Sequence, residues 1–532
     1  MRPSQLRAPR RRAPRSLSPP GALLAPLGLS ALALSACARE QAPTEIPTPA
    51  PSFSEAGAKG AQGAQGAQGA PVRADEPWWE RFGDSGLSAL VGGLMSQNLA
   101  LAQAQERVIQ MRAVATQTGS QRWPQLNLDV GWSRNKQLNQ FALLNRSGSS
   151  SSSSSAAAGS SSDMSAAGGA GAMPTSFTLD SYRASLAVSY EVDIWGRVGS
   201  LTEAAERDAV AAEQDLRGMA VTLSASAVDL WLQLVELGAR EGLLKGQVED
   251  AEELLALTAA RFEEGLAPHL QVLQQAQQRD SLLAQLPLLE AQRGAMTRRL
   301  AALLGRASLS LSLPAALPTL PPVPAVGLPG EALLARPDVR AAQARLAAAD
   351  ARVSAAVSAR YPSLRLGGSV GLQAFEVGKL FDDFVWGLSA GLLAPIFDAG
   401  RLSAAQAQQE SALRERALAL KERLITAYHE VEDALALERQ QRAQLALLDE
   451  VLAGAEALVE SSMERYLEGL GDFVSVLSAR QALYSAQLSR LSAARACLSS
   501  RVQLHRALAG DLPGDLPGDL PATPSQPIDS QE

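Results

Sequence analysis

The feature that most constrains this chain is an internal duplication of a very long helical segment. Gly196-Arg197 recurs as Gly400-Arg401, and Arg261–Leu266 (RFEEGL) recurs as Arg465–Leu470 (RYLEGL). Both repeats are displaced by 204 residues (197 to 401, and 261 to 465), so the segment between them is copied without a gap. Such a repeat predicts one architecture built from two like halves rather than several unrelated domains.

The repeated segment carries an uninterrupted helical pattern. It runs from Arg197 to about Ala260, and at 1.5 Å per residue this helix is about 95 Å long, too long for an ordinary globular domain. Apolar residues recur at alternating spacings of four and three, which is the seam of a coiled coil. The positions are Leu216, Ala220, Leu223, Ala227, Leu230 and Leu234 in the first copy, and Leu413, Ala417, Leu420, Leu424, Ala427 and Val431 in the second.

Two shorter helices are predicted beside the long one. They cover roughly 85–121 and 268–304, and their summed length is about that of the long helix, so we expect them to stack end to end along it. The Pro-rich stretch 305–329 is expected to join the first structural repeat, 78–304, to the second, 330–510, as an irregular linker midway along the helices.

Short segments of alternating character predict four β-strands. The strand before the first long helix covers Tyr182–Asp193, and the one before the second begins near Trp386. Each places apolar residues on one face and polar or small residues on the other, and each is about long enough to cross a membrane at a tilt. The apolar positions of the other two are Leu126, Leu128, Val130 and Trp132, and Leu364, Leu366, Val370 and Leu372.

Four strands cannot close a barrel by themselves. In lipid, an open sheet edge leaves backbone groups unpaired, which costs several kcal/mol for each group. If these strands span a membrane, several copies of the chain must therefore share one barrel. The alternative is a soluble sheet of two hairpins packed on helices, which the great length of the flanking helices disfavours.

The N-terminal region reads as a secretory signal followed by a tether. Residues 1–36 are Arg-rich and then apolar, and they end in small residues before Cys37, as in a bacterial lipobox. This predicts lipidation of Cys37, and, by resemblance to enterobacterial lipoprotein sorting, the absence of an acidic residue at position 38 favours the outer membrane. The alternative is a plain signal peptide with an incidental cysteine. Residues 37–77 are expected to be a flexible tether, and 511–532 a disordered tail.

Composition argues against catalysis and against nucleic-acid binding. The chain has 48 basic and 55 acidic residues, for a net charge of −7, so no nucleic acid partner is expected. Its two cysteines and three scattered histidines form no disulfide framework and no metal cage. No catalytic motif stands out, and we therefore predict neither an enzyme nor a cofactor.

Together these features resemble the TolC-like outer-membrane efflux family, in the lipoprotein branch that serves tripartite RND pumps. The resemblance covers about 78–510 and is carried by Leu34–Cys37, Trp78–Phe82, Tyr190–Arg197, Arg336–Arg340, Tyr361–Leu364, Pro395–Arg401 and Arg465-Tyr466. It implies a mainly α fold with a small β part. Three chains would build a twelve-stranded transmembrane β-barrel in a homotrimer, continued by an α-helical barrel across the periplasm.

The resemblance also assigns roles to particular positions. The turns at Gly265-Leu266 and Gly469-Leu470 would be periplasmic tips on which a membrane-fusion adaptor docks, although glycine is also the usual residue that ends a helix. Gly196-Arg197 and Gly400-Arg401 would be the corners between strands and helices.

Relatives close the tunnel with an apolar residue, an aspartate and an arginine. The aligned positions here are Val474, Ser478 and Gln481, so the aspartate and the arginine are absent, although Asp472 and Arg480 lie nearby. A ring of aspartates attracts cations. We therefore expect this channel to be less cation-selective than relatives that carry the acidic ring.

The function predicted first is a passive exit duct for small toxic compounds (drugs, possibly metals) in the outer membrane. Its partners would be further copies of itself, an adaptor, an inner-membrane RND pump and outer-membrane lipid. One alternative is the duct of a type I protein secretion system, and a second is a lipid-anchored coiled-coil scaffold that does not conduct.

Overall fold

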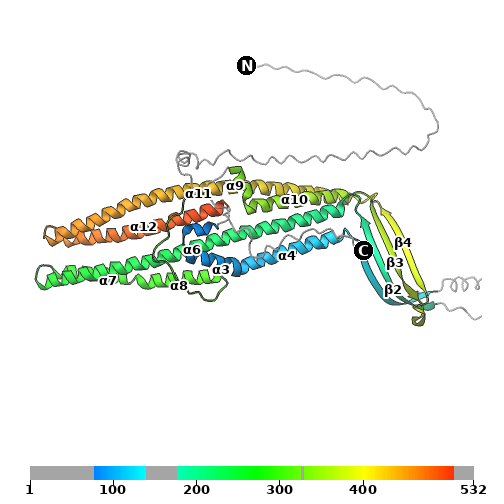
Figure 1. Ribbon diagram of the computed structural model, residues 1–532, viewed down its shortest axis with the longest axis horizontal. Coiled ribbons are helices and arrows are strands. Elements are labelled where there is room, and N and C mark those ends of the chain that lie inside the picture. The colour runs from blue at the N-terminus through cyan, green and yellow to red at the C-terminus, as the bar shows by residue number, and fades with distance from the viewer. Residues whose placement is uncertain (1–76, 139–175, 325–328, 509–532) are drawn as a thin grey trace, which may run out of the picture. The chain divides into compact units, whose positions relative to one another are not determined.

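The structure is a computed structural model that describes residues 77–138, 176–324 and 329–508. The predicted signal peptide, Cys37, the tether, the Ser-rich stretch near 150 and the C-terminal tail lie outside these residues. Figure 1 shows the described elements in chain order. They are η1 (Trp78–Phe82), α3 (Ser85–Gln97), α4 (Leu99–Ser120), β1 (Gln125–Leu138), β2 (Ser176–Val192), α6 (Arg197–Glu263), α7 (His269–Leu283), α8 (Leu286–Leu303), α9 (Pro329–Ala335), α10 (Pro337–Ser358), β3 (Ser363–Ala374), η2 (Val377–Lys379), β4 (Phe384–Leu393), α11 (Arg401–Leu467) and α12 (Phe473–Ala507).

The predicted duplication is confirmed by the helix boundaries. The long helices α6 and α11 both contain 67 residues, and each begins directly after the glycine of its repeat. The short helices α4 and α10 both contain 22 residues, and they are offset by 238 residues (99 to 337). At 1.5 Å per residue, each long helix is about 100 Å long.

Glycines in the left-handed conformation set both ends of the long helices. Gly196 and Gly400 precede α6 and α11 with φ of 71° and 86°. At the far ends, Gly265 and Gly469 have φ of 69° and 74°. A residue with a Cβ pays a steric penalty in this region, so glycine is the natural residue at all four positions.

The single helix predicted over 85–121 is wrong in one respect, because it breaks at Asn98. This residue is extended, with φ −68° and ψ 124°, and its side chain accepts a hydrogen bond from the Leu101 amide at 2.9 Å. Its side-chain nitrogen donates to the Leu303 carbonyl at 2.6 Å. Asn98 therefore ends α3, caps α4 and joins both to the end of α8.

The second short helix, predicted over 268–304, is also divided. It breaks at Ala284-Gln285, just before Pro287 in the first turn of α8. Proline has no amide hydrogen to donate and clashes with the preceding turn, so it belongs at a helix start. The equivalent of Pro287 in the second repeat is Leu491, and there α12 is continuous. The end-to-end stacking of α8 and α4 beside α6 is confirmed.

The four strands form one antiparallel sheet in the order β1-β2-β3-β4. The two predicted hairpins therefore lie side by side, joined by the β2–β3 pairing. Strand β2 begins at Ser176, earlier than the predicted Tyr182, because it pairs with every residue of β1, from Gln125 with Ser189 to Leu138 with Ser176. In a single chain, β1 and β4 are the edges of the sheet.

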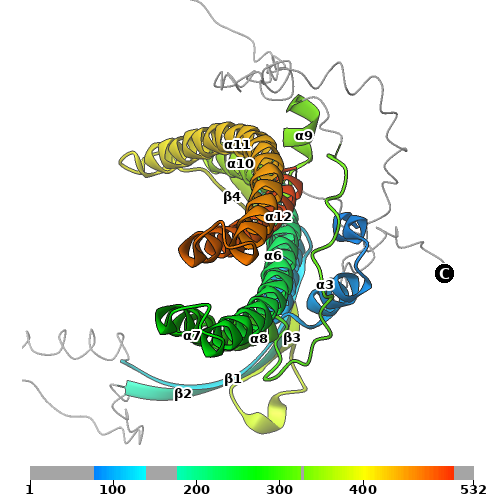
Figure 2. The same cartoon turned by 90° about the vertical axis from the view of Figure 1, so that its left-hand side faces the viewer.

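The packed core lies where several helices converge on the middle of α6. Trp78 and Trp231 are 0% and 1% exposed, and the Trp231 indole donates to the Asp84 carboxylate at 2.8 Å. Figure 2 shows α6 with α7 and α8 on one side and α12 on the other. The irregular chain after α8 covers this core with Leu309, Leu311, Leu313, Leu317 and Leu320, a packing role that the sequence analysis did not predict.

Candidate functional site

One face of the sheet is a continuous apolar surface that is exposed in the single chain. Register places Leu128 opposite Leu186, Leu186 opposite Val370, and Val370 opposite Trp386. Leu128 and Trp386 are 72% and 71% exposed. A soluble sheet would bury such a face, whereas a sheet in lipid exposes it. Further exposed apolar residues of this face are Leu126, Val130, Trp132, Val188, Leu366, Leu388 and Leu392.

The other face of the sheet carries polar and small residues. Asp129 pairs with Ser185, which pairs with Gly371. Ser369 in turn pairs with Gly387 across the β3–β4 ladder. At Gly371 a Cβ would come within 2.5 Å of the Ala184 carbonyl oxygen, so this position has no room for a side chain. This face could line a water-filled passage.

The first strand–helix corner is held by acidic residues at the end of β2. Arg197 donates to the Glu191 carboxylate from Nε at 3.1 Å and from Nη2 at 2.7 Å. The Asp193 carboxylate accepts a hydrogen bond from the Gly199 amide at 2.6 Å. Asp193 thus binds the positive end of α6, where free amide groups favour a negative charge.

This corner is also fixed to the second half of the chain. The Trp195 indole donates to the Pro362 carbonyl at 2.8 Å, and the Ser358 hydroxyl donates to the Trp195 carbonyl at 2.8 Å. The Trp195 ring stacks on Tyr361 with 4.8 Å between centroids. A cavity of about 500 Å³ lies beside these contacts and is bordered by residues of both corners.

The second corner also has an aspartate that accepts hydrogen bonds near the start of its helix, but it has no equivalent of the Trp195–Tyr361 contact. The Asp398 carboxylate accepts from the Gly400 amide at 3.0 Å and the Leu402 amide at 2.9 Å. These amide hydrogen bonds, that of Leu402 first, hold the pKa of Asp398 below its ordinary value. Ala399 stands where the first corner has Trp195, and Ile396 and Phe397 are 97% and 89% exposed.

The two predicted tips have the same turn geometry. The Leu266 amide donates to the Arg261 carbonyl at 2.8 Å, and the Leu470 amide donates to the Arg465 carbonyl at 2.9 Å, as in a Schellman motif. Leu266 and Leu470 are 64% and 69% exposed. Each tip therefore presents a leucine side chain to solvent, beside a glycine that closes the helix.

The predicted constriction residues lie on one exposed stripe at the start of α12. Val474 is 54% exposed, Ser478 and Gln481 are also exposed, and their spacing puts them on one helix face. The Gln481 side chain donates to Gln278 of α7 at 3.2 Å. Arg480 points elsewhere and pairs with Asp250 of α6 at 3.7 Å.

Asp472 is the N-cap of α12. Its carboxylate accepts hydrogen bonds from the amide and the hydroxyl of Ser475. These bonds, that of the hydroxyl first, lower the pKa of Asp472, so the residue is ionised at neutral pH. The stripe of Val474, Ser478 and Gln481 therefore carries no charge, and Asp472 is the acidic residue next to it.

A charged cluster at the start of α10 was not predicted from the sequence. Arg336 is 5% exposed and pairs with Asp338 at 2.8 Å and with Glu430 at 2.5 Å. It also donates to the Ala507 carbonyl at 2.7 Å. Burial raises the pKa of Asp338, but Arg336 and Arg423 outweigh it, so this pKa lies below its ordinary value. The motif Arg336–Arg340 contributes to the family resemblance, but its sequence alone does not indicate this cluster.

Two general features of the described residues bear on function. They contain no group of three or more His, Cys, Asp and Glu side chains that could hold a metal ion. One of their helices, α6, has a window apolar enough to cross a membrane, but 56% of that window is buried against other helices. Packing in the core accounts for this apolar run.

Comparison with known proteins agrees with this geometry. The chain is 31% identical over 489 residues to the pyoverdine export outer membrane protein OpmQ of Pseudomonas putida, covering 92% of this chain and 96% of that protein. It is 33% identical to the toluene efflux pump outer membrane protein TtgF of the same species, over 62% of this chain and 69% of the relative.

Solved structures show the same architecture. The outer-membrane channel OprN superposes with a TM-score of 0.71 at 25% identity, covering 81% of this chain and 92% of that one. The open state of the MtrE channel of Neisseria gonorrhoeae superposes with a TM-score of 0.67 at 24% identity, covering 80% and 89%. The profile of the outer membrane efflux protein family matches residues 90–306 and 328–510, and this chain belongs to that family.

Proposed function

We propose that three copies of this chain form the outer-membrane exit duct of a tripartite RND-type efflux pump. The observation that carries the proposal is the sheet, which has an exposed apolar face and two free edge strands, β1 and β4. Both features are costly in a monomer. Both are relieved when the edges of neighbouring copies pair within a bilayer.

The helices supply the passage between the membranes. Each chain contributes two helices of 67 residues, and both lead away from the sheet at the corners. Their tips lie about 100 Å from the corners. A ring of such helices from three copies would continue the barrel as a tunnel through the periplasm, with the polar face of the sheet lining its outer part.

The tips and the N-terminus supply the attachments. We propose that Leu266 and Leu470, with Gly265 and Gly469, dock against a membrane-fusion adaptor, because exposed leucines on a fixed turn suit an apolar contact. We further propose that Cys37 is acylated, which would anchor each copy to the outer membrane. The inner-membrane pump would supply the energy, and the duct itself would perform no chemistry.

The cargo is proposed to be small toxic compounds. The relatives are named for export of pyoverdine and of toluene, which are unlike one another. Two cavities of the described residues, one on α4 and one beside the corners, are open depressions rather than closed pockets with convergent polar groups. A duct without such a pocket would leave the choice of cargo to the pump and adaptor.

Planar-bilayer recording of the detergent-purified protein tests this function. A trimeric duct gives discrete conductance steps, whereas a coiled-coil scaffold gives none. Crosslinking from Gly265 and Gly469 in native membranes then identifies the docked protein. An adaptor of an RND pump supports the efflux assignment, whereas an adaptor of a type I secretion system points to protein export.

A further inference from the structure

Within one chain, α10 packs closely against α6 through a stripe of small and charged residues. Ala341 and Ala348 of α10 are fully buried, and on the same stripe Arg345 and Arg352 form ion pairs with Asp215 and Asp208 of α6. These pairings show that the two helices run antiparallel. The contact joins the first half of the chain to the second.

Repeat symmetry assigns a counterpart to each side of this contact. The offset of 238 residues carries α10 onto α4, and the offset of 204 residues carries α6 onto α11. A single chain has no contact between α4 and α11 equivalent to that between α10 and α6. The counterpart of the α10 stripe is therefore left on the surface of α4, and that of the α6 stripe on the surface of α11.

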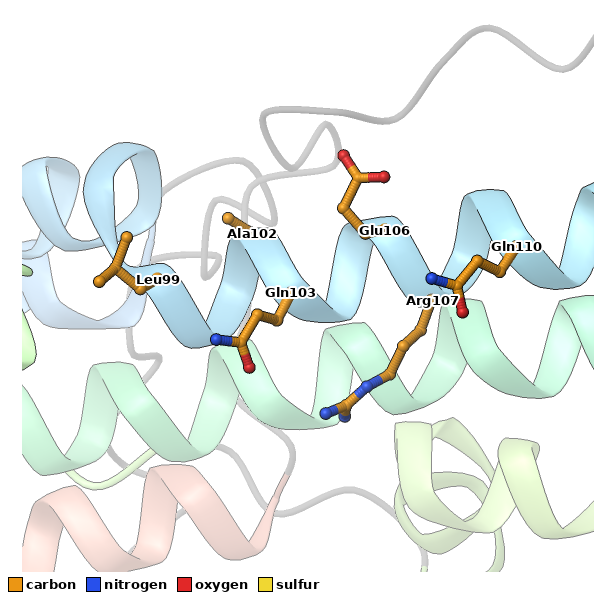
Figure 3. A pocket seen from close by; sticks show the side chains of 6 residues that line it. All are labelled: Leu99, Ala102, Gln103, Glu106, Arg107 and Gln110. Atoms are coloured by element: carbon orange, nitrogen blue, oxygen red, sulfur yellow. The ribbon is translucent and has the colours of Figure 1, made fainter.

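The surface of α4 at this place is exposed and hollowed. A depression of about 480 Å³ is lined there by Leu99, Ala102, Gln103, Glu106, Arg107 and Gln110; Figure 3 shows these side chains. Gln103, Arg107 and Gln110 are the equivalents of Ala341, Arg345 and Ala348. The three α10 residues are buried or half-buried, whereas the three α4 residues are exposed.

The equivalent surface of α11 is also exposed, and it carries acidic residues. Ala211 of α6 is 2% exposed, whereas its equivalent Glu415 is exposed, as is Glu422 two turns further on. Within the described part of the chain, Arg107, Glu415 and Glu422 make no ion pair. A basic residue on one surface thus faces acidic residues on the other, once the two are brought together.

The register of the α10–α6 contact, applied to α4 and α11, predicts which residues of the two surfaces face each other. Arg345 lies opposite Asp215, so Arg107 falls opposite Ala419 of α11. The Arg107 side chain extends along α4 toward Gln103, as Figure 3 shows. On an antiparallel partner this direction leads to higher residue numbers, from Ala419 toward Glu422.

The same symmetry continues into the corners. Tyr361, at the end of α10, stacks on Trp195. Its equivalent at the end of α4 is Trp123, which is 72% exposed, and the equivalent of Trp195 is Ala399. Beyond these residues lie the free edges β1 and β4. One continuous surface on each side of the chain therefore lacks its partner.

We propose that the α4 surface formed by Gln103, Glu106, Arg107 and Gln110 binds α11 of a second copy of this chain, with Arg107 paired to Glu422 of that copy. The proposal rests on the proposed trimer and specifies the joint that closes it. In the contact within a chain, alanines allow the helices to approach closely. The joint between copies has glutamine and glutamate at the equivalent positions instead, so it is wider, and its exposed Arg107–Glu422 pair is weakened by salt.

Charge reversal tests this joint. Arg107→Glu and Glu422→Arg are each expected to raise the protein concentration at which half of the trimers dissociate in detergent by about tenfold at low salt, because each replaces an attraction by a repulsion at every joint. The double variant restores the pair and is expected to return within about twofold of the wild type. Native mass spectrometry over a concentration series measures all of them.

Arg207→Glu is the matched control. Arg207 is 51% exposed on α6 and pairs with Glu203 at 3.6 Å, but α6 already contacts both α4 and α10. This variant is expected to dissociate like the wild type. The joint is overturned if either single variant matches the control, or if the double variant is no better than the weaker single variant. If the wild type does not form trimers, the proposed duct is contradicted as well. If trimers conduct and charge reversal does not change their dissociation, only the proposed joint is contradicted.

Discussion

Arg336 donates a hydrogen bond of 2.7 Å to the carbonyl oxygen of Ala507, which joins the start of α10 to the end of α12. The first repeat has an equivalent hydrogen bond, but a different type of side chain donates it. There Asn98 occupies the position of Arg336 and donates to the carbonyl of Leu303 at 2.6 Å. Repeat symmetry has thus preserved the contact while one side chain is charged and the other is neutral.

The two joints are expected to respond differently to truncation. Arg336→Ala removes the buried cation from Asp338 and Glu430, while Asp338 keeps Arg423, and we expect a loss of about 3 kcal/mol in unfolding free energy, the low end of the cost of breaking a buried ion pair. Asn98→Ala removes a neutral cap and one hydrogen bond, and is expected to cost about 1–3 kcal/mol. Denaturant unfolding in detergent measures both.

Arg336→Lys separates charge from geometry in this joint. Arg336 uses three guanidinium nitrogens to reach Asp338, Glu430 and Ala507, which a single ammonium group cannot reproduce. The lysine variant is expected to fall between the wild type and the alanine variant. Equal stability of all three proteins contradicts the role given to Arg336.

The periodic parts of the fold could be predicted from the sequence, but its interruptions could not. The coiled-coil seam and the strand alternation are repeated over many residues, so they survive the substitution of any single one. The breaks at Asn98 and before Pro287 each depend on one residue and its local contacts. A Pro in the first turn of a helix and a Pro that ends a helix look alike in a sequence.

The candidate site was predicted unevenly for the same reason. Turns at Gly265 and Gly469 are signalled by glycine after a helical pattern, and the left-handed φ values agree. The Arg336 cluster draws residues from three distant parts of the chain. No local pattern contains such an arrangement, and only the packed structure brings it together.

Acidification is expected to destabilise the protein through His505. Burial, with Arg81 and Arg501 nearby, lowers the pKa of His505 to about 3, and its ring stacks on Trp78 at 5.2 Å. The unfolded chain, with an ordinary histidine pKa near 6.5, takes up the proton first. The contribution of His505 to the unfolding free energy is therefore complete above about pH 6.5. Below that pH, this contribution falls by up to about 1.4 kcal/mol per pH unit.

His505→Gln removes that titration. Its unfolding free energy is expected to fall less steeply between pH 6.5 and pH 4 than that of the wild type, although it is lower at pH 7 because the ring contact is lost. Denaturant midpoints across this pH range measure the difference. Parallel curves for the two proteins contradict the assignment to His505.

The tips offer a way to separate docking from helix capping. Leu266→Ser with Leu470→Ser removes two exposed apolar side chains and leaves the glycines in place. We expect adaptor crosslinking to fall several-fold without a change in thermal stability. Leu288→Ser is the matched control, because Leu288 is 61% exposed on α8, outside the tips, and its replacement is expected to leave crosslinking unchanged. Undiminished crosslinking in the double serine variant contradicts docking through these leucines.

Ion selectivity tests the uncharged stripe at the start of α12. With Val474, Ser478 and Gln481 in the constriction, the wild type is expected to show weak cation preference in reversal potentials across a salt gradient. Ser478→Asp adds a carboxylate to each copy and is expected to raise that preference. Asp472→Ala reports the contribution of the neighbouring acid. Strong cation selectivity that persists in Asp472→Ala contradicts this account.

The central claim is that the sheet is embedded in lipid and completed by further copies of the chain. The most direct measurement is the fractionation and native mass of a Cys37→Ala variant exported by a cleavable signal peptide. Without an acyl anchor, it is predicted to stay in the outer membrane until detergent is added, and then to elute as a particle of three copies. A single copy recovered in the aqueous fraction contradicts the claim.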